Sequence, residues 1–503
     1  MAMTKDLIIA IDQSTSGTKG LLLDRNGRII KKHSVKHRQI YPQSGWVEHD
    51  PMEIYENVKS ILNQLARTLS VSEGKLSVLS ITNQRETIVV WDKETGKPIH
   101  HAIVWQCRRS TEICRQLVEK GYEDLVLSKT GLQLDPYFSA SKITWILENV
   151  AGAKEKAQEG KLLLGTMDSW LIWKLTEGNV HATDVTNASR TLLYNIYTND
   201  WDDELLKIFD IPRLMLPVVK QSDAYFGKIK DSDIELLNLP IAGVIGDSQG
   251  ALLAQKCVEK GMAKATFGTG TSIMVYTKEP VKGKNGLVTS VAWGMDGQVH
   301  YALEGIINTT GDIIRWLKNE LQLFTDFDEC EAEATSIADN SGVYLIPAFV
   351  GLGAPYWSPD TRAAIFGMDR STTKSHLIRA GLESIAYQVK DIVELVHSES
   401  SVTIKELRVD GGAINNQFLM QFLADMLDVP VIVSDTAELS AMGAVYLGGL
   451  SVGIWNSFEE IKQLEAIYHT YYPKMARETA ENYYQKWKQY VHILIQQNKK
   501  VLV

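Results

Sequence analysis

Runs of apolar residues alternate with amphipathic segments along the whole chain. Two apolar runs near the N-terminus, residues 7–13 and 20–24, flank a turn of small polar residues and predict two strands. A further buried strand is predicted at 76–82. Between them, residues 52–69 predict an amphipathic helix, because apolar residues recur at helical spacing at Ile54, Val58, Ile61, Leu62 and Leu65.

A second helix is predicted at residues 137–150, which read YFSASKITWILENV. Ser139 is the expected N-cap, because a serine side chain can accept a hydrogen bond from the first backbone amides of a helix. The apolar face of this helix is formed by Ile143, Ile146 and Leu147. The mixture of strand and helix signals along the chain indicates an α/β protein.

The plan of the first turn recurs in the second half of the chain. Residues 265–276, ATFGTGTSIMVY, again predict a strand, a Gly/Thr/Ser turn and a strand. Residues 407–427 place a glycine pair between a strand and an amphipathic helix, and a helical stretch at 250–262 separates the halves. Because 503 residues are many for a single hydrophobic core, we predict two related domains, 1–254 and 255–503, facing one cleft.

The composition is that of a globular protein, with 45% hydrophobic and 22% charged residues. A net charge of −9 argues against a broad basic face for nucleic acid. The four cysteines, Cys107, Cys114, Cys257 and Cys330, form no C-x-x-C pair and fit a reducing compartment. No apolar run approaches the length of a membrane span, and we expect a cytoplasmic protein.

The small-residue turns predict phosphate binding. Gly, Ser and Thr allow several backbone amides to converge on an anion. For the first turn alone, DQSTSGTKG at 12–20, an ordinary tight hairpin is an equally good interpretation. The chain has no G-x-x-x-x-G-K-[ST] loop and no G-x-G-x-x-G after its first strand, which disfavours the commonest nucleotide folds. Three such turns in one chain favour a phosphate-handling cleft.

Two aspartates stand directly after predicted strands. Asp12 precedes the first turn, and Asp247 follows an apolar run in VIGDSQGALLA. Carboxylates at the carboxyl ends of strands lie where ligands bind in open α/β sheets. One could organise Mg²⁺, mostly through waters, and the other could accept a proton from an attacking hydroxyl. The alternative for Asp247 is a helix N-cap.

Four further polar and aromatic residues are candidates for a polyol site. Arg85 and Glu86 are adjacent charges between two apolar runs, where charges are costly unless they have partners. The alternative is a surface ion pair. Trp105 follows a strand and Tyr137 precedes a helix, and each aromatic residue could equally belong to the core. Together they could bind hydroxyl groups and pack against a carbon chain.

Longer segments resemble the FGGY family of carbohydrate kinases, and within it the glycerol kinase group. They follow in order through nearly the whole chain: GWVEHDPMEI, ITNQRET, KETGKPI, AIVWQCRR, DPYFSASKITWIL, DVTNASRTLLYNI, VYLIPAFVGLGAPYW and LRVDGGAINNQFLMQFLADML. The stretches YFSASKITWILEN and AIFGMDRSTTKSHLIRAGLE are similar to the two signatures of the family.

The resemblance implies an actin-like fold, with two ribonuclease-H-like domains and ATP in the cleft between them. It implies Mg²⁺, phosphorylation of a terminal hydroxyl of a small polyol such as glycerol to glycerol 3-phosphate, and a homodimer or homotetramer. Asp247 would be the catalytic base, with Asp12 and Asp247 as metal ligands. The acceptor site would contain Arg85, Glu86, Trp105, Tyr137, Asp247, Ser248 and Ser272. The nucleotide site would contain Asp12, Thr15, Ser16, Lys19, Thr269, Gly311, Arg315, Gly412 and Asn416.

The chain departs from the usual glycerol kinase pattern at five of these positions or beside them. Ser14 and Ser16 stand for Gly and Thr, Lys19 for Arg, Ser248 for Gln, and Ser272 for a Phe that packs on glycerol. The alternatives that remain are a kinase for a larger polyol or ketose and a non-kinase ATPase of the same fold.

Overall fold

The computed structural model describes residues 6–69, 74–283, 285–358, 360–400, 402–436, 438–465 and 467–501. The chain forms two compact units. The first contains residues 1–256, 289–301 and 438–465, and the second contains 257–288, 302–437 and 466–503. Two segments of the second half of the sequence therefore belong to the first unit, and the domain ranges expected from the sequence stay a prediction.

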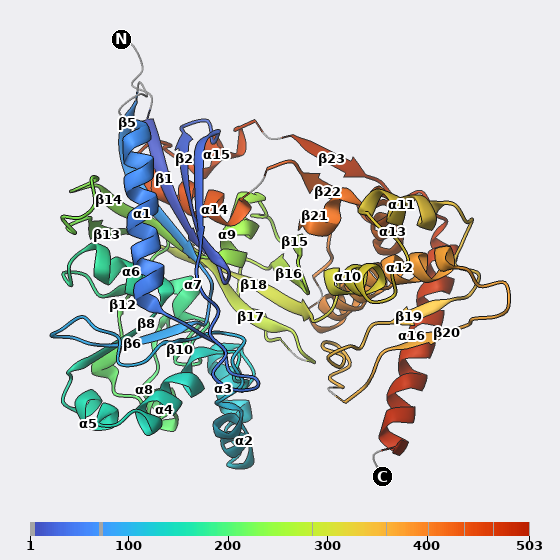
Figure 1. Ribbon diagram of the computed structural model, residues 1–503, viewed down its shortest axis with the longest axis horizontal. Helices are drawn as coiled ribbons and strands as arrows, with labels where there is room; N and C mark the ends of the chain where they lie inside the picture. Colours follow the sequence, from blue (N-terminus) through green and yellow to red (C-terminus); the bar gives the residue numbers. More distant parts are fainter. Residues whose placement is uncertain are drawn as a thin grey trace. The chain divides into compact units, whose positions relative to one another are not determined.

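The first unit is built on a six-stranded sheet in the order β13-β14-β5-β1-β2-β3 (Figure 1). β1, β2 and β3 form an antiparallel meander, and β5 and β14 continue from β1 in parallel. The predicted strands at 7–13, 20–24 and 76–82 are confirmed within these elements. The strands are β1 (Asp6–Gln13), β2 (Gly17–Asp24), β3 (Ile29–Lys36), β5 (Lys75–Asn83), β13 (Tyr225–Lys228) and β14 (Pro240–Gly246).

Helix α1 (Pro51–Leu69) packs on this sheet through the apolar stripe that the sequence predicts, since all five residues of that stripe are fully buried. Helix α14 (Leu439–Ser451) comes from the far end of the chain and packs on β14, β5 and helix α9 (Asp247–Ala254). Gly443 and Gly250 permit this close packing, because a Cβ on Gly443 would lie 2.2 Å from the carbonyl oxygen of Gly250.

The first unit also contains a four-stranded sheet in the order β4-β7-β6-β8 and short helices. The strands of this sheet are β4 (Glu48–His49), β6 (Ile88–Asp92), β7 (Ala102–Ile103) and β8 (Leu162–Thr166). Two strand pairs belong to the first unit as well, β10 (Tyr194–Asn195) with β11 (Asp200–Trp201), and β9 (Ala182–Asp184) with β12 (Val218–Lys220). The helices are α2 (Thr111–Glu119), α3 (Glu123–Thr130), α4 (Ser139–Asn149), α5 (Ala153–Gln158), α6 (Met167–Leu175), α7 (Val185–Ala188), α8 (Asp203–Ile208) and α15 (Phe458–Lys462).

The second unit repeats the arrangement of the first sheet. β18, β16 and β15 form an antiparallel meander, and β21 and β22 continue from β15 in parallel. These strands are β15 (Met262–Phe267), β16 (Thr271–Tyr276), β18 (Gln298–Ile307), β21 (Glu406–Gly411) and β22 (Val431–Ser434), followed by β23 (Tyr468–Tyr471). β17 (Val288–Met295) pairs with β18, and residues 289–301, which include all of β17 except Val288, belong to the first unit.

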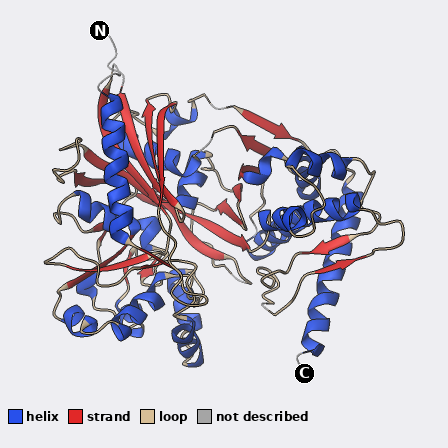
Figure 2. Ribbon diagram, in the orientation of Figure 1, coloured by secondary structure: helices blue, strands red, loops and turns tan. Residues whose placement is uncertain are grey.

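The second unit also contains helices, which Figure 2 draws in blue. They are α10 (Gly311–Asn319), α11 (Phe327–Thr335), α12 (Lys374–Ser400), α13 (Gln417–Leu427) and α16 (Arg477–Val501), with a small pair of strands, β19 (Tyr344–Ile346) and β20 (Ala364–Phe366). The duplicated pattern of three antiparallel and two parallel strands confirms the expected α/β class with two related sheets.

Two local predictions are wrong. Ser139 is the first residue of α4 rather than its cap, because Phe138 has the extended N-cap conformation and the Ser139 hydroxyl donates to the carbonyl of Glu86. The helical stretch expected at 250–262 ends at Ala254, and β15 already begins at Met262. Along the described part of the chain, no helix combines the length and the hydropathy that crossing a bilayer requires.

Candidate functional site

The carboxyl ends of three parallel strands bring the candidate residues of the first unit to one edge of its sheet. In the register, Asp12 of β1 lies beside Thr82 of β5, and Gly246 of β14 lies beside Asn83. The chain leaves β5 directly into Gln84 and Arg85, and it leaves β14 directly into Asp247. Asp12, Arg85 and Asp247, which are separated by 73 to 235 positions in the sequence, therefore share one edge.

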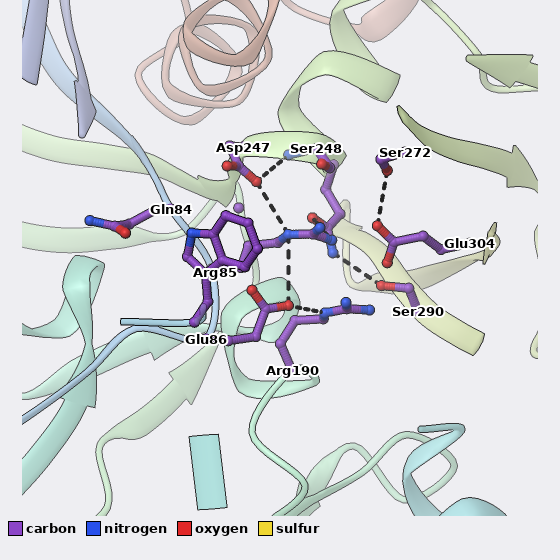
Figure 3. A network of polar contacts seen from close by, with 12 residues as sticks. Gln84, Arg85, Glu86, Arg190, Asp247, Ser248, Ser272, Ser290 and Glu304 are labelled. Carbon is purple, nitrogen blue, oxygen red and sulfur yellow. Dashed lines mark hydrogen bonds and ion pairs between the residues drawn. The ribbon is translucent and has the colours of Figure 1, made fainter. Parts of the chain in front are cut away.

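Arg85, Glu86, Arg190 and Asp247 form a connected charge network (Figure 3). Arg85 Nε lies 3.2 Å from Asp247 Oδ1 and 3.9 Å from Glu86 Oε1, and Arg190 Nε donates to the same glutamate oxygen at 2.6 Å. Arg85, Glu86 and Arg190 are all buried. The alternative of a surface ion pair is therefore wrong: each buried charge faces an opposite one, as low-dielectric surroundings demand.

The backbone of Glu86 supports the same arrangement. Its φ of 60° lies in the left-handed region, which a non-glycine residue adopts at a cost of about 1–3 kcal/mol. The two arginines that meet its carboxylate hold it in this conformation. Backbone strain of this kind is concentrated at functional sites.

Asp247 is the first residue of α9, and Gly246 is the N-cap. The interpretation of Asp247 as a helix N-cap is therefore wrong, although its carboxylate accepts from the Ser248 amide at 2.6 Å. Its side chain is 38% exposed, whereas that of Arg85 is 5% exposed. Gly246 lets the arginine approach, since a Cβ there would lie 2.9 Å from Arg85 Cγ. Asp247 therefore contacts the buried Arg85 on one side, and its other side is accessible to solvent.

Asp12 is a buried carboxylate. Burial raises its pKa to about 7, the Lys19 ammonium at 4.0 Å opposes this, and the negative charges of Asp247 and Glu438 add to it. Lys19 itself pairs with Glu438 at 2.6 Å, and Lys32 pairs with the other oxygen of that glutamate. This part of the sheet edge therefore contains carboxylates that could face a cation and ammonium groups that could face a phosphate.

The first small-residue turn is a tight hairpin between β1 and β2, in which the Ser14 amide donates to the Gly17 carbonyl. Ser16 is exposed at its tip. The hydroxyl of Thr15 accepts a hydrogen bond from the Trp105 indole at 2.9 Å. Hairpin geometry and exposed small residues coexist here, so the hairpin interpretation does not exclude phosphate binding.

Trp105 and Tyr137 pack edge to face, with ring centroids 5.4 Å apart. Both are partly exposed rather than core residues. The segment that carries Tyr137 is held by the buried Lys142, whose ammonium donates to the carbonyls of Pro136, Tyr137 and Phe138 at 2.6–2.8 Å. The structure therefore brings Trp105, Tyr137, Arg85, Glu86 and Asp247 into one unit.

The second unit contains a pocket of about 620 Å³. All five residues that the sequence assigns to the nucleotide in this half line it: Thr269, Gly311, Arg315, Gly412 and Asn416. The Gly311 amide donates to the carbonyl of Gly268, and Arg315 donates to the Thr269 hydroxyl at 2.9 Å. Asn416 accepts from the amide of Leu419 and caps α13. The Gly/Thr turn after β15 and the glycine pair after β21 thus meet at one cavity.

Ser272 also belongs to the second unit. It lies on β16, and its hydroxyl donates to the carboxylate of Glu304 on β18 at 3.0 Å. Glu304 is fully buried. Ser272 therefore provides a hydroxyl that is hydrogen-bonded to Glu304 at a position where a phenylalanine would provide an apolar surface.

Sequence reasoning missed several residues at these sites. In the second unit, Phe327, Asp328 and Glu331 also line the pocket. In the first unit, Gln249 accepts from Arg85 and donates to the hydroxyl of Ser290. Phe327 carried one usable signal, an aromatic residue within an acidic helix, but Gln249 and Arg190 are brought in only by the tertiary fold.

Comparison with known proteins decides the family. Residues 7–254 match the N-terminal domain, and residues 263–452 the C-terminal domain, of the FGGY family of carbohydrate kinases. The chain belongs to the FGGY family of carbohydrate kinases. This FGGY chain is 48% identical over 490 residues to a glycerol kinase of Xanthomonas campestris pv. campestris, covering 97% of this chain and 98% of the relative. It is 49% identical to a glycerol kinase of Shewanella sediminis, with 97% and 99% covered.

Solved structures agree with this assignment. The FGGY chain superposes on Plasmodium falciparum glycerol kinase, solved with ADP, with a TM-score of 0.94 and 36% identity, covering 98% of both chains. It superposes on xylulose kinase from Lactobacillus acidophilus with a TM-score of 0.88 and 22% identity, covering 97% of each chain, a likeness that shows the fold alone.

Proposed function

We propose that this FGGY kinase transfers the γ-phosphoryl group of ATP to a terminal hydroxyl of a small polyol, with glycerol as the first candidate. The observation that carries the proposal is the pairing of Arg85 with Asp247 beside Glu86, Trp105 and Tyr137 in a relative of glycerol kinases at 48–49% identity. A cytoplasmic location and a homodimer or homotetramer belong to the same proposal.

The acceptor roles follow from the geometry of the first unit. Arg85 and Glu86 offer a buried donor and a buried acceptor for two hydroxyl groups, and the Tyr137 phenol offers a third polar contact. The Trp105 ring packs against the carbon chain. Asp247 accepts the proton of the attacking hydroxyl, because its carboxylate is oriented by Arg85 and is the most accessible group of the network. Ser248 is a further proposed acceptor contact in this unit, and for Ser272, which belongs to the second unit, the acceptor role rests on the family resemblance alone.

Each unit contains residues to which we assign a nucleotide role. In the second unit, Thr269, Gly311, Arg315, Gly412 and Asn416 line a cavity large enough for a nucleoside. In the first unit, Thr15, Ser16 and Lys19 supply hydroxyl, amide and ammonium donors to phosphate oxygens, an arrangement typical of phosphate-binding turns.

The residues present fit Mg²⁺. Mg²⁺ keeps several waters and takes one or two carboxylates together with phosphate oxygens. Asp12 and Asp247 are the proposed pair, and the negative charge of Asp247 is one of the causes that raise the pKa of Asp12. Among the described residues no cluster of three or more His, Cys, Asp or Glu side chains could hold a metal ion. When bound, Mg²⁺ would supply neutralisation of phosphate charge.

A panel of glycerol, erythritol, ribitol and ribulose with coupled ADP detection tests the proposal. We expect ADP formation from MgATP to rise many-fold with glycerol. Slow hydrolysis that no polyol stimulates would contradict a kinase and favour a non-kinase ATPase of the same fold.

A larger polyol or ketose is the second candidate acceptor. It is supported by Ser272, which stands where glycerol kinases usually have a Phe and which points its hydroxyl at Glu304. The same panel distinguishes the two candidates by the ratio of their kcat/KM values.

A further inference from the structure

Six residues of the first unit form a closed ring of hydrogen bonds through their side chains and two backbone groups. The ring starts at Thr15 in the first turn and passes through Gln39 and His49 to Gln84, next to Arg85. It returns through Thr87 and Trp105. The six bonds are Gln39 Nε2 to Thr15 O (2.8 Å), His49 Nε2 to Gln39 Oε1 (2.9 Å), Gln84 Nε2 to His49 Nδ1 (3.3 Å), Thr87 Oγ1 to Gln84 Oε1 (3.0 Å), Trp105 N to Thr87 Oγ1 (3.3 Å) and Trp105 Nε1 to Thr15 Oγ1 (2.9 Å).

The donor directions of this ring are consistent with only one state of His49. Gln39 must donate to the Thr15 carbonyl, so its amide oxygen accepts from His49 Nε2. Gln84 donates to His49 Nδ1 with one amide hydrogen and to Gln13 with the other, while its oxygen accepts from Thr87. His49 is therefore neutral, with its proton on Nε2.

The surroundings of His49 keep it neutral. Its side chain is fully buried, and the ring of His37 packs against it with centroids 4.5 Å apart. Burial, together with His37, lowers the pKa of His49 to about 3. His49 therefore stays neutral, and the hydrogen bonds of its imidazole keep the same directions, throughout the pH range in which an enzyme is assayed.

The hydroxyl hydrogen of Thr15 takes no part in the ring. Because the Thr15 oxygen accepts from the Trp105 indole, its hydroxyl hydrogen is available to another acceptor. Thr15 is a proposed phosphate contact, and Trp105 and the Gln84–Arg85 segment belong to the proposed acceptor site. The ring thus joins the two binding functions of the first unit through Gln39 and His49.

We propose that Gln39 and His49 are positioning residues, which align the Thr15 hydroxyl for a nucleotide phosphate and the Gln84–Arg85 segment for the acceptor. This inference rests on the proposed function, to which it adds two residues outside the motif positions assigned to either ligand. The two nitrogens of His49 support different parts of the site. Nε2 supports Thr15 through Gln39, and Nδ1 supports Gln84.

Two amide substitutions separate these two roles of His49. In H49N the amide stands near the place of Nδ1 and can still meet Gln84, whereas in H49Q it stands near the place of Nε2 and can still meet Gln39. A neutral hydrogen bond contributes about 2- to 12-fold to an equilibrium. We expect H49N to raise the Kd for ADP about 3- to 10-fold with the acceptor KM changed less than about 2-fold, and H49Q to show the reverse pattern.

Q39M and H181Q provide the second variant and the control. Gln39 is half-buried, so Q39M should fold and raise the Kd for ADP as H49N does. His181 is half-buried, contacts the carbonyl of Leu164 and packs against Trp91, so H181Q should change only the melting temperature. Equal shifts of both constants in H49N and H49Q, or an unchanged Kd in Q39M, would overturn the inference.

The readouts also distinguish this inference from the proposed function. Calorimetric ADP binding requires no turnover, so it reports on the link to Thr15 even if no polyol is phosphorylated. Absence of any polyol-stimulated turnover in the unsubstituted protein contradicts the proposed function alone. Normal turnover with no crossed pattern in the His49 variants contradicts the positioning role alone.

Discussion

The guanidinium of Arg85 holds the carboxylate of Asp247 at 3.2 Å, and of the two side chains only the aspartate is open to solvent. The buried Arg85 side chain is fixed in position, because it also contacts Glu86 and Gln249. The aspartate therefore presents its second carboxylate oxygen in a set direction. This pair connects the proposed general base, Asp247, to Arg85 of the proposed polyol site.

Asp247→Asn should abolish most turnover while the fold and ADP binding remain. The amide keeps the size of the side chain but cannot accept the hydroxyl proton, and loss of a general base typically costs about 10²- to 10⁴-fold in kcat. Steady-state kinetics and calorimetric ADP binding check this. Near-normal turnover at neutral pH would show that another group is the base.

Arg85→Ala should raise the KM for the polyol more than the KM for ATP. A lost hydrogen bond to a charged group costs about 1.5–3 kcal/mol, or roughly 10- to 150-fold. Arg115→Ala is a matched control, since Arg115 pairs with Glu112 and Glu119 on the exposed face of α2 and should change neither constant. Equal rises in both KM values would instead indicate a purely structural arginine.

Asp12→Asn should stabilise the protein at pH 8 and not at pH 4. Burial raises the pKa of Asp12 to about 7 in the folded protein, so the folded state binds its proton more tightly than the unfolded chain does. The resulting cost is absent below the unfolded pKa near 3.8, grows as pH rises, and is complete above about 7, where it amounts to roughly 4 kcal/mol. Urea unfolding at both pH values checks this, and a pH-independent difference would refute it. Activity should fall in the same variant if Asp12 helps to hold Mg²⁺.

Lys142→Met should destabilise the first unit, but by less than the sum of three lost hydrogen bonds, because burial disfavours the lysine charge and lowers the pKa of Lys142 to about 7. Methionine fills a similar volume but leaves the carbonyls of residues 136–138 without their donor, and each buried acceptor left unsatisfied costs about 1–3 kcal/mol. Urea denaturation monitors the loss. The acceptor KM should rise too, because Tyr137 lies in the loosened segment. Lys154→Met, which removes an exposed pair with Asp210, should have little effect on either quantity.

Ser272→Phe should shift preference towards glycerol. The present serine leaves volume and a hydroxyl where an aromatic wall is usual, so the unsubstituted enzyme should accept four- or five-carbon polyols, or ketoses, with kcat/KM within about tenfold of glycerol. Kinetics on glycerol, erythritol, ribitol and ribulose measure this. A preference for glycerol above about a hundredfold, roughly 2.7 kcal/mol, in the unsubstituted enzyme would refute the enlarged site.

Local patterns predicted the framework of the fold well, because they depend on neighbours in the sequence. The stripe from Ile54 to Leu65 identified α1, and the small-residue turns identified the loops that line the pocket of the second unit. Ser139 failed as a cap because a tertiary partner, the Glu86 carbonyl, takes its hydroxyl. Local propensity carries no information about such a partner.

The polar networks could not be predicted for the same reason. Arg190 forms an ion pair with Glu86, which is more than a hundred residues away in the sequence. Glu438 forms an ion pair with Lys19, which is more than four hundred residues away. Arg190 lies in the turn after α7 and Glu438 lies in the segment after β22, and the residues next to them in the sequence do not reveal these distant partners. Only the packing of α14 and of the segment after α7 brings them to the sheet edge.

The position of α14 in the sequence sets the order in which this protein can mature during synthesis. Residues 1–256 leave the ribosome first, but the helix that covers their sheet is made about 180 residues later, after most of the second unit. At 5–20 residues per second this delay is roughly 10–40 seconds. Throughout it, the apolar face that will receive Leu439–Ser451 is uncovered, so the nascent first half is a natural client for a chaperone, and a truncation at residue 256 should yield an aggregating fragment rather than an independent domain.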